Sequence, residues 1–151
     1  MNNVLEVAHL KKSFGEKNVI KELNFKCGEG ESIVILGESG MGKSVTMRMI
    51  GMLLDPTSGS IKINGREIVG ISDANKNDVM SRVGFLFQHC GLFDNLTVWE
   101  NVAFRELYVL HMKPNLAKEM AVEALSSVGM SESSIHLKPY EISGGMQKRV
   151  A

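Results

Sequence analysis

Residues 37–44 read GESGMGKS and have the residue types and spacing of a loop that binds phosphate groups. Its glycines permit left-handed dihedral angles and let backbone N–H groups approach an anion closely. Lys43 supplies a positive charge for β- and γ-phosphates, and Ser44 supplies a hydroxyl that can bind Mg²⁺. The string alone could still be a glycine-rich turn that precedes a lysine, so the flanking sequence decides in favour of a nucleoside triphosphate site.

The flanking sequence predicts the elements that such a loop needs. The apolar run SIVIL (32–36) predicts a strand buried on both faces, and KSVTMRMIGMLL (43–54) predicts a helix whose N-terminal end faces the anion. RVGFLF (82–87) predicts a second buried strand. Upstream, alternation over 4–10 and 19–27 predicts a β-hairpin. The first part of the chain is thus α/β in class.

The sequence after residue 94 predicts helices. Thr97 and Glu100 have the spacing of a capping box at the start of a helix over 97–112. A second amphipathic helix begins at Pro114. We therefore predict a strand-rich core over 1–94, a helical subdomain over 95–141, and over 142–151 the SGGM stretch with the start of a further helix.

Composition narrows the classes of function. The 17 basic and 17 acidic residues give zero formal net charge, which argues against a nucleic-acid partner. Cys27 and Cys90 lack the spacing of a metal site or a disulfide framework, which favours a reducing compartment. The chain has no apolar run long enough to cross a bilayer, so we expect any role at a membrane to depend on a partner.

Three further stretches narrow the class of nucleotide-binding protein. They are Phe14 within KKSFGEKNVI, the segment FQHCGLFDNLTVWENV at 87–102, and SGGM at 143–146. With the phosphate loop, and in this order, they make the chain similar to the ATP-binding subunit of ABC transporters. The resemblance runs along essentially the whole chain. It implies a P-loop NTPase core of the ABC type, with an N-terminal antiparallel β-hairpin region, a small helical subdomain, and ATP and Mg²⁺ as cofactors.

The resemblance also implies roles for individual residues. Phe14 stacks on adenine, and Gln88 reaches Mg²⁺ and the attacking water, so Gln88 and Lys43 are catalytic candidates and Ser44 and Gln88 are metal ligands. Independently of the resemblance, Phe14 could be a hairpin-core residue and Ser143 an ordinary helix N-cap. The full set expected to bind the nucleotide is Phe14, Gly37, Glu38, Ser39, Gly40, Met41, Gly42, Lys43, Ser44, Val45, Ser143, Gly144 and Gly145.

The resemblance further implies partners. In the family, SGG faces the γ-phosphate of ATP held by the other subunit of a head-to-tail homodimer, and a groove lined around 88–102 receives a cytoplasmic helix of an ABC permease. The subunit then lies peripherally on the cytoplasmic side of the membrane. The spelling ISGGM, with Ile142 and Met146, is most similar to Mla-type subunits that serve lipid transport with Mce-domain proteins.

One part of the family pattern is missing. The family's apolar strand ending in Asp-Glu and its later histidine do not occur here, and the chain has roughly two-thirds of the family's usual length. Three hypotheses stay open: a truncated ABC-type ATPase subunit, a non-hydrolysing nucleotide-binding remnant, and an unrelated phosphate-loop enzyme such as a small-molecule kinase. We expect the isolated chain to bind ATP weakly without turnover. We also expect its final helix, with about six residues after Gly145, to be poorly held.

Overall fold

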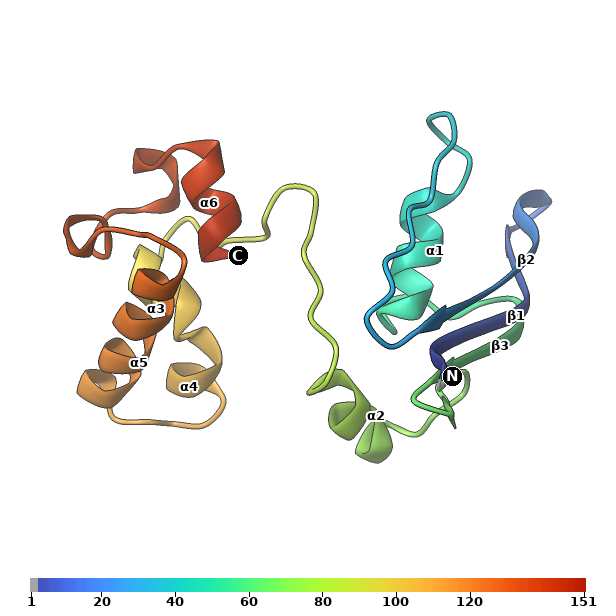
Figure 1. The fold of residues 1–151 in the computed structure, drawn as a ribbon, viewed down its shortest axis with the longest axis horizontal. Coiled ribbons are helices and arrows are strands. Elements are labelled where there is room, and N and C mark those ends of the chain that lie inside the picture. Colours follow the sequence, from blue (N-terminus) through green and yellow to red (C-terminus); the bar gives the residue numbers. More distant parts are fainter. Residues whose placement is uncertain (1–2) are drawn as a thin grey trace. The chain divides into compact units, whose positions relative to one another are not determined.

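The computed structural model describes residues 3–151, which form two compact units, one ending at Phe85 and the other running from Leu86 to Ala151 (Figure 1). Residues 86–94 thus lie in the second unit, although the sequence placed them with the strand-rich core. Residues 142–151 also belong to the second unit, because Ile142 and Val150 share its core cluster with Val98 and Leu125.

The first unit is built on a four-stranded antiparallel sheet. Its strands are β1 (Asn3–Phe14), β2 (Lys17–Gly28), β3 (Ser58–Ile63) and β4 (Arg66–Glu67), in the order β2-β1-β3-β4. Figure 1 labels the first three of them. β1 and β2 form the predicted hairpin and turn tightly, with the Cα atoms of Phe14 and Lys17 paired at its end. The antiparallel N-terminal sheet expected from the sequence is confirmed.

Two helices complete the core of the first unit. Helix α1 (Lys43–Ile50) contributes Met49, and α2 (Asp73–Met80) contributes Val79, to a cluster that includes Leu10 and Ile61 of the sheet. Helix α2 was not predicted, because it has too few apolar side chains to give a periodic signal. The helix predicted over 43–54 is shorter in the structure, because α1 ends at Ile50 with Gly51 as its C-cap.

The two strands predicted as buried are not strands in this structure. Residues 32–36 have no sheet partner among residues 3–151, and Val34 and Leu36 are 76% and 85% exposed. Residues 82–87 likewise form no strand. An apolar β-branched run becomes a buried strand only where neighbouring backbone accepts and donates its hydrogen bonds, and the sheet within residues 3–151 does not extend to these segments.

The second unit is helical. Its elements are α3 (Val98–Val102), α4 (Phe104–Tyr108), α5 (Pro114–Ser127), the 3₁₀ turns η1 (Glu132–Ser134) and η2 (Pro139–Glu141), and α6 (Gly144–Val150). The single helix predicted over 97–112 is two short helices that meet at Ala103. Helix α5 begins at Pro114, as predicted, and buries Ala117, Ala121 and Leu125.

Candidate functional site

The phosphate loop depends on glycine at one position for two separate reasons. Gly42 has a φ angle of 90°, and a Cβ atom there would lie 3.1 Å from a side-chain carbon of Val19 and 3.1 Å from one of Ile20. Gly40 shares the positive φ, at 85°, but has open space around it. The backbone at Gly42 is therefore pressed against β2 in a conformation that disfavours any other residue.

Thr46 fixes the junction between this loop and α1. Its backbone N–H and its hydroxyl both donate to the Gly42 carbonyl, at 2.8 and 3.1 Å, and the residue is buried. The free N–H groups of the first helical turn follow directly after the glycine loop. The positive end of the helix dipole and the loop amides are therefore close together, which suits an anion.

The Lys43 side chain binds the backbone at the start of the phosphate loop. Its ammonium donates to the carbonyl oxygens of Gly37 and Glu38, at 2.7 Å each. The ammonium has three N–H donors, and phosphate oxygens could replace these carbonyl oxygens as their acceptors. A phosphate held by the loop would therefore be a partner for Lys43. The neighbouring Ser44 is exposed at the first turn of α1.

A divalent cation fits this loop only together with phosphate oxygens. In the part of the chain that the structure describes, no cluster of three or more His, Cys, Asp or Glu side chains could hold a metal ion. The Ser44 hydroxyl is one oxygen donor, whereas Mg²⁺ prefers six oxygen ligands. A bound triphosphate and water would have to supply most of the others.

Phe14 lies at the end of β1 and is 48% exposed, so it is not a hairpin-core residue. The hairpin that carries it adjoins the phosphate loop, because Val19 and Ile20 of β2 are the residues that Gly42 contacts. The structure therefore brings Phe14 and residues 37–45 into the same region of the first unit. Its exposure argues against the hairpin-core interpretation, and stacking on adenine stays a prediction.

The other predicted site residues belong to the second unit. Gln88 is exposed at the start of a turn over residues 88–91, in which Cys90 has a φ angle of 62°. Ser143 is the N-cap of α6, where its hydroxyl oxygen accepts from the Met146 N–H at 3.3 Å. Gly144 and Gly145 are exposed in the first turn of the same helix.

Helix α6 is packed rather than loosely held, so that expectation from the sequence is wrong. Ile142 and Val150 are buried, and the Gln147 amide donates to the Pro139 carbonyl at 2.8 Å. The Arg149 guanidinium donates to the Gly129 carbonyl, at 3.1 Å, at the end of α5. Tertiary contacts therefore compensate for a helix too short to be stable alone.

The segment between Gln88 and α3 is also fixed by side chains. The capping box is confirmed: the Glu100 carboxylate accepts from the Thr97 hydroxyl at 2.6 Å and its N–H at 2.7 Å, which holds the pKa of Glu100 below its ordinary value. Asn101 was not predicted to act here, yet its amide accepts from the Phe93 N–H and donates to the Phe93 and Leu96 carbonyls. A lone asparagine inside a helical pattern gave no signal for this role.

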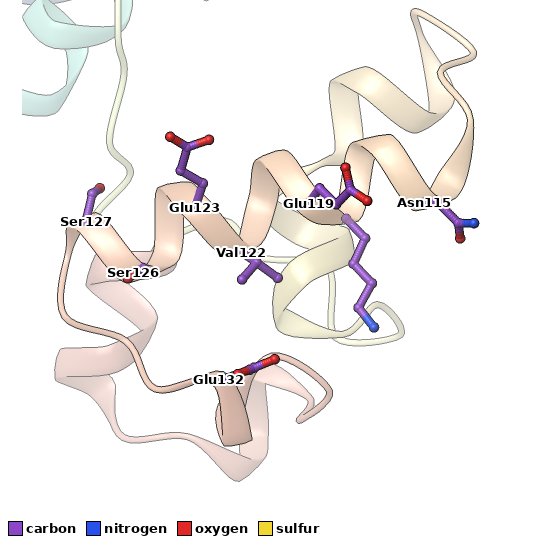
Figure 2. A pocket seen from close by; sticks show the side chains of 8 residues that line it. Asn115, Glu119, Val122, Glu123, Ser126, Ser127 and Glu132 are labelled. Atoms are coloured by element: carbon purple, nitrogen blue, oxygen red, sulfur yellow. The ribbon is translucent and has the colours of Figure 1, made fainter.

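A hollow of about 810 Å³ lies elsewhere on the second unit, along α5 and η1. Figure 2 shows Glu119, Glu123 and Glu132 among the side chains that line it. None of the residues predicted to bind a nucleotide lines it, and its carboxylates are unsuited to phosphate groups. The phosphate loop remains the candidate site.

A glycine loop pressed against a strand, a lysine inside the loop and a helix beginning at that lysine define the phosphate-binding site of a P-loop NTPase. The chain belongs to the ABC transporter family, which residues 20–151 match. This membership excludes the hypothesis of an unrelated phosphate-loop enzyme.

No helix within residues 3–151 has the length and apolarity needed to cross a bilayer.

Individual relatives differ in what they transport. Protein TRIGALACTOSYLDIACYLGLYCEROL 3, chloroplastic, of Arabidopsis thaliana is 39% identical, over 98% of this chain and 42% of that protein. The histidine/lysine/arginine/ornithine transport ATP-binding protein HisP of Escherichia coli (strain K12) is 37% identical over 99% and 62%. The intermembrane phospholipid transport system ATP-binding protein MlaF of Haemophilus influenzae is 34% identical over 99% and 56%. This chain thus spans about half the length of these relatives.

Solved structures show the same architecture. A dimeric ATP-binding cassette in a post-hydrolysis state with ADP and Pi superposes with a TM-score of 0.82 at 31% identity, over 97% of this chain and 66% of that one. A dimeric bacterial ABC transporter cassette gives a TM-score of 0.83 at the same identity and coverage. The fold is therefore that of ATP-binding cassettes, as the sequence predicted.

Proposed function

We propose that this chain is the nucleotide-binding part of an ABC transporter ATPase subunit and that it binds ATP through residues 37–45 and Phe14. The observation that carries the proposal is the position of Lys43, whose ammonium lies inside a glycine loop at the start of α1. A loop of this geometry offers backbone donors, a helix N-terminus and a cation to one anion. Phe14 offers the apolar face that a nucleobase needs.

The other predicted residues take their roles within this proposal. Lys43 neutralises charge on the β- and γ-phosphates, and the Ser44 hydroxyl holds Mg²⁺ beside them. Gln88 orients the attacking water, and Ser143 with its two following glycines faces the γ-phosphate of ATP on a second subunit. The N-cap geometry of Ser143 and the exposed amides after it support that last role.

We further propose that the 151 residues bind ATP but do not turn it over on their own. Hydrolysis needs a positioned water and Mg²⁺ held from more than one side. The sequence has no apolar run ending in Asp-Glu, and the described residues contain no acidic cluster that would replace it. This leaves two hypotheses, a subunit that needs further polypeptide for catalysis and a non-hydrolysing remnant.

Partners follow from the same proposal. We expect a permease subunit in the membrane, a head-to-tail homodimer, and a position on the cytoplasmic face of that membrane. Dimeric solved relatives support the homodimer. Charge changes at Asp94 or Glu100 should impair coupling to the permease more than nucleotide binding, because both residues lie just after Gln88 in the segment that side-chain hydrogen bonds of Asn101 and Glu100 fix.

For the transported substrate we propose a lipid, with an Mce-domain protein as an additional partner. The spelling ISGGM and the similarity to MlaF support this choice, while the similarity to HisP supports an amino acid instead. Co-purification of the tagged chain from its own cells tests it. Recovery of a permease with an Mce-domain protein is the expected result, and recovery of a permease with an amino-acid-binding protein would contradict it.

Calorimetric titration with ATP and Mg²⁺ tests the proposed binding function. We expect saturable binding by the unaltered chain and at least a tenfold loss, about 1.4 kcal/mol, in Lys43→Ala. Lys21→Ala removes an exposed lysine of β2 as the matched control and should bind normally. Equal binding by the Lys43 variant, or no binding by the unaltered chain, would overturn the proposal.

A further inference from the structure

We infer that Lys12 is a positioning residue for the base of the nucleotide, an inference that rests on the proposed binding of ATP. The Lys12 ammonium lies over the ring of Phe14, 5.0 Å from its centroid. The ammonium takes one face of this half-exposed ring, so a stacked base would take the other face. The base is thereby directed to a single face of Phe14.

The Lys12 ammonium is held in this position by the backbone. It donates to the Asp55 carbonyl at 2.6 Å, and the side chain is partly buried. The adjacent backbone is tied to the same segment, because the Thr57 N–H donates to the Lys11 carbonyl at 2.9 Å and the Ser13 N–H donates to the Thr57 hydroxyl at 3.0 Å. The end of β1 is therefore clamped to residues 55–57, which follow α1.

This clamp connects the ring to the phosphate loop. Lys12 pairs in register with Ile20 of β2, and Ile20 is one of the two residues against which Gly42 is pressed. Gly42 thus lies against β2 at the residue that pairs with Lys12, and this pairing joins the phosphate loop to the strand that carries Phe14. The pairing of β1 with β2 would therefore set the distance between a stacked base and the phosphates.

The charge on Lys12 also changes the ring itself. Aromatic faces carry negative potential, so two stacked faces repel electrostatically. A cation on the far face of Phe14 withdraws electron density and makes the near face a better partner for an electron-rich purine. We therefore expect the Lys12 charge to act on the base, because its ammonium contacts the Phe14 ring and the Asp55 carbonyl.

Separate titrations with ATP and with inorganic triphosphate test the inference. Lys12→Met retains the aliphatic stem and should weaken ATP binding about two- to fivefold while leaving triphosphate binding unchanged. Lys12→Arg should restore ATP affinity, since a guanidinium can make both contacts. The control Lys21→Met removes the same charge from an exposed position on β2 and should leave both affinities unchanged.

The outcomes separate this inference from the proposed function. Lys43-dependent ATP binding that is unaffected in Lys12→Met would overturn the inference alone. So would an equal loss of ATP and triphosphate affinity, because Lys12 would then act on the loop or on the phosphates. Absence of Lys43-dependent binding in the unaltered chain would overturn the proposed function and the inference with it.

Discussion

Gly42 of the phosphate loop lies against Ile20 of β2 so closely that a Cβ atom on Gly42 would be 3.1 Å from the Ile20 Cγ1 atom. This contact joins the loop to the hairpin that carries Phe14. It gives a structural reason for a glycine that the motif alone explains only through its backbone angles.

Gly42→Ala should lower the free energy of unfolding of the first unit by about 1–3 kcal/mol, because it combines a strained positive φ with a steric contact. Gly40→Ala is the matched control, since it has nearly the same φ but open space around it. Urea denaturation followed by circular dichroism measures both. Equal losses in the two variants would show that the contact with β2 is unimportant.

Ile142→Ala should destabilise the second unit by about 2–4 kcal/mol, because it removes a buried side chain beneath α6. Leu110→Ala removes a similar volume from an exposed position and should change stability by less than about 0.5 kcal/mol. Thermal unfolding of the chain checks the difference. An Ile142 variant as stable as the Leu110 variant would mean that α6 is not packed in solution.

The capping box should make the stability of the second unit depend on pH. Hydrogen bonds from Thr97 hold the pKa of Glu100 below its ordinary value of 4.5 in the folded state. The stabilisation is therefore fully present above that ordinary value and is lost as the pH falls through the lower, folded pKa.

Urea titrations between about pH 3 and pH 7 should accordingly show a smaller loss of stability in acid for Glu100→Gln than for the unaltered chain. The control Glu123→Gln removes an exposed carboxylate of α5 and should change this loss far less. If the Glu100→Gln variant loses as much stability in acid as the unaltered chain does, the Glu100 carboxylate is not held by Thr97.

The exposed apolar segment 32–36 should cause the isolated chain to self-associate. It has a strand-forming sequence and no sheet partner within residues 3–151, which is the pattern of an aggregation site. Leu36→Lys should reduce association measured by sedimentation velocity. Leu53→Lys removes an exposed leucine outside the segment, and an equal reduction there would mean that general hydrophobicity is responsible.

Local patterns predicted the local features of this chain. The hairpin, the loop around Lys43, the capping box at Thr97 and the start of α5 at Pro114 all depend on residues close in sequence, and the structure has them. The contact between Gly42 and Ile20 and the cation over Phe14 join distant residues, so no local pattern could reveal them.

The errors have the same origin. Segment 32–36 has the composition of a buried strand. A strand forms only beside neighbouring strands that share its backbone hydrogen bonds, and the composition of a segment does not show whether such strands are present. Helix α6 was expected to be loose because it is short, yet Ile142 and Arg149 hold it through contacts with residues from other parts of the second unit. In both cases tertiary contacts decided the outcome.

The central claim is that ATP is held by the backbone of the phosphate loop. Nuclear magnetic resonance of the ¹⁵N-labelled chain, titrated with ATP and Mg²⁺, tests it most directly. We predict the largest amide shifts within residues 37–46, with changes at Phe14, and none of these in Lys43→Ala. Shifts concentrated along α5 and η1, around Glu119 and Glu132, with an unperturbed loop would contradict the account.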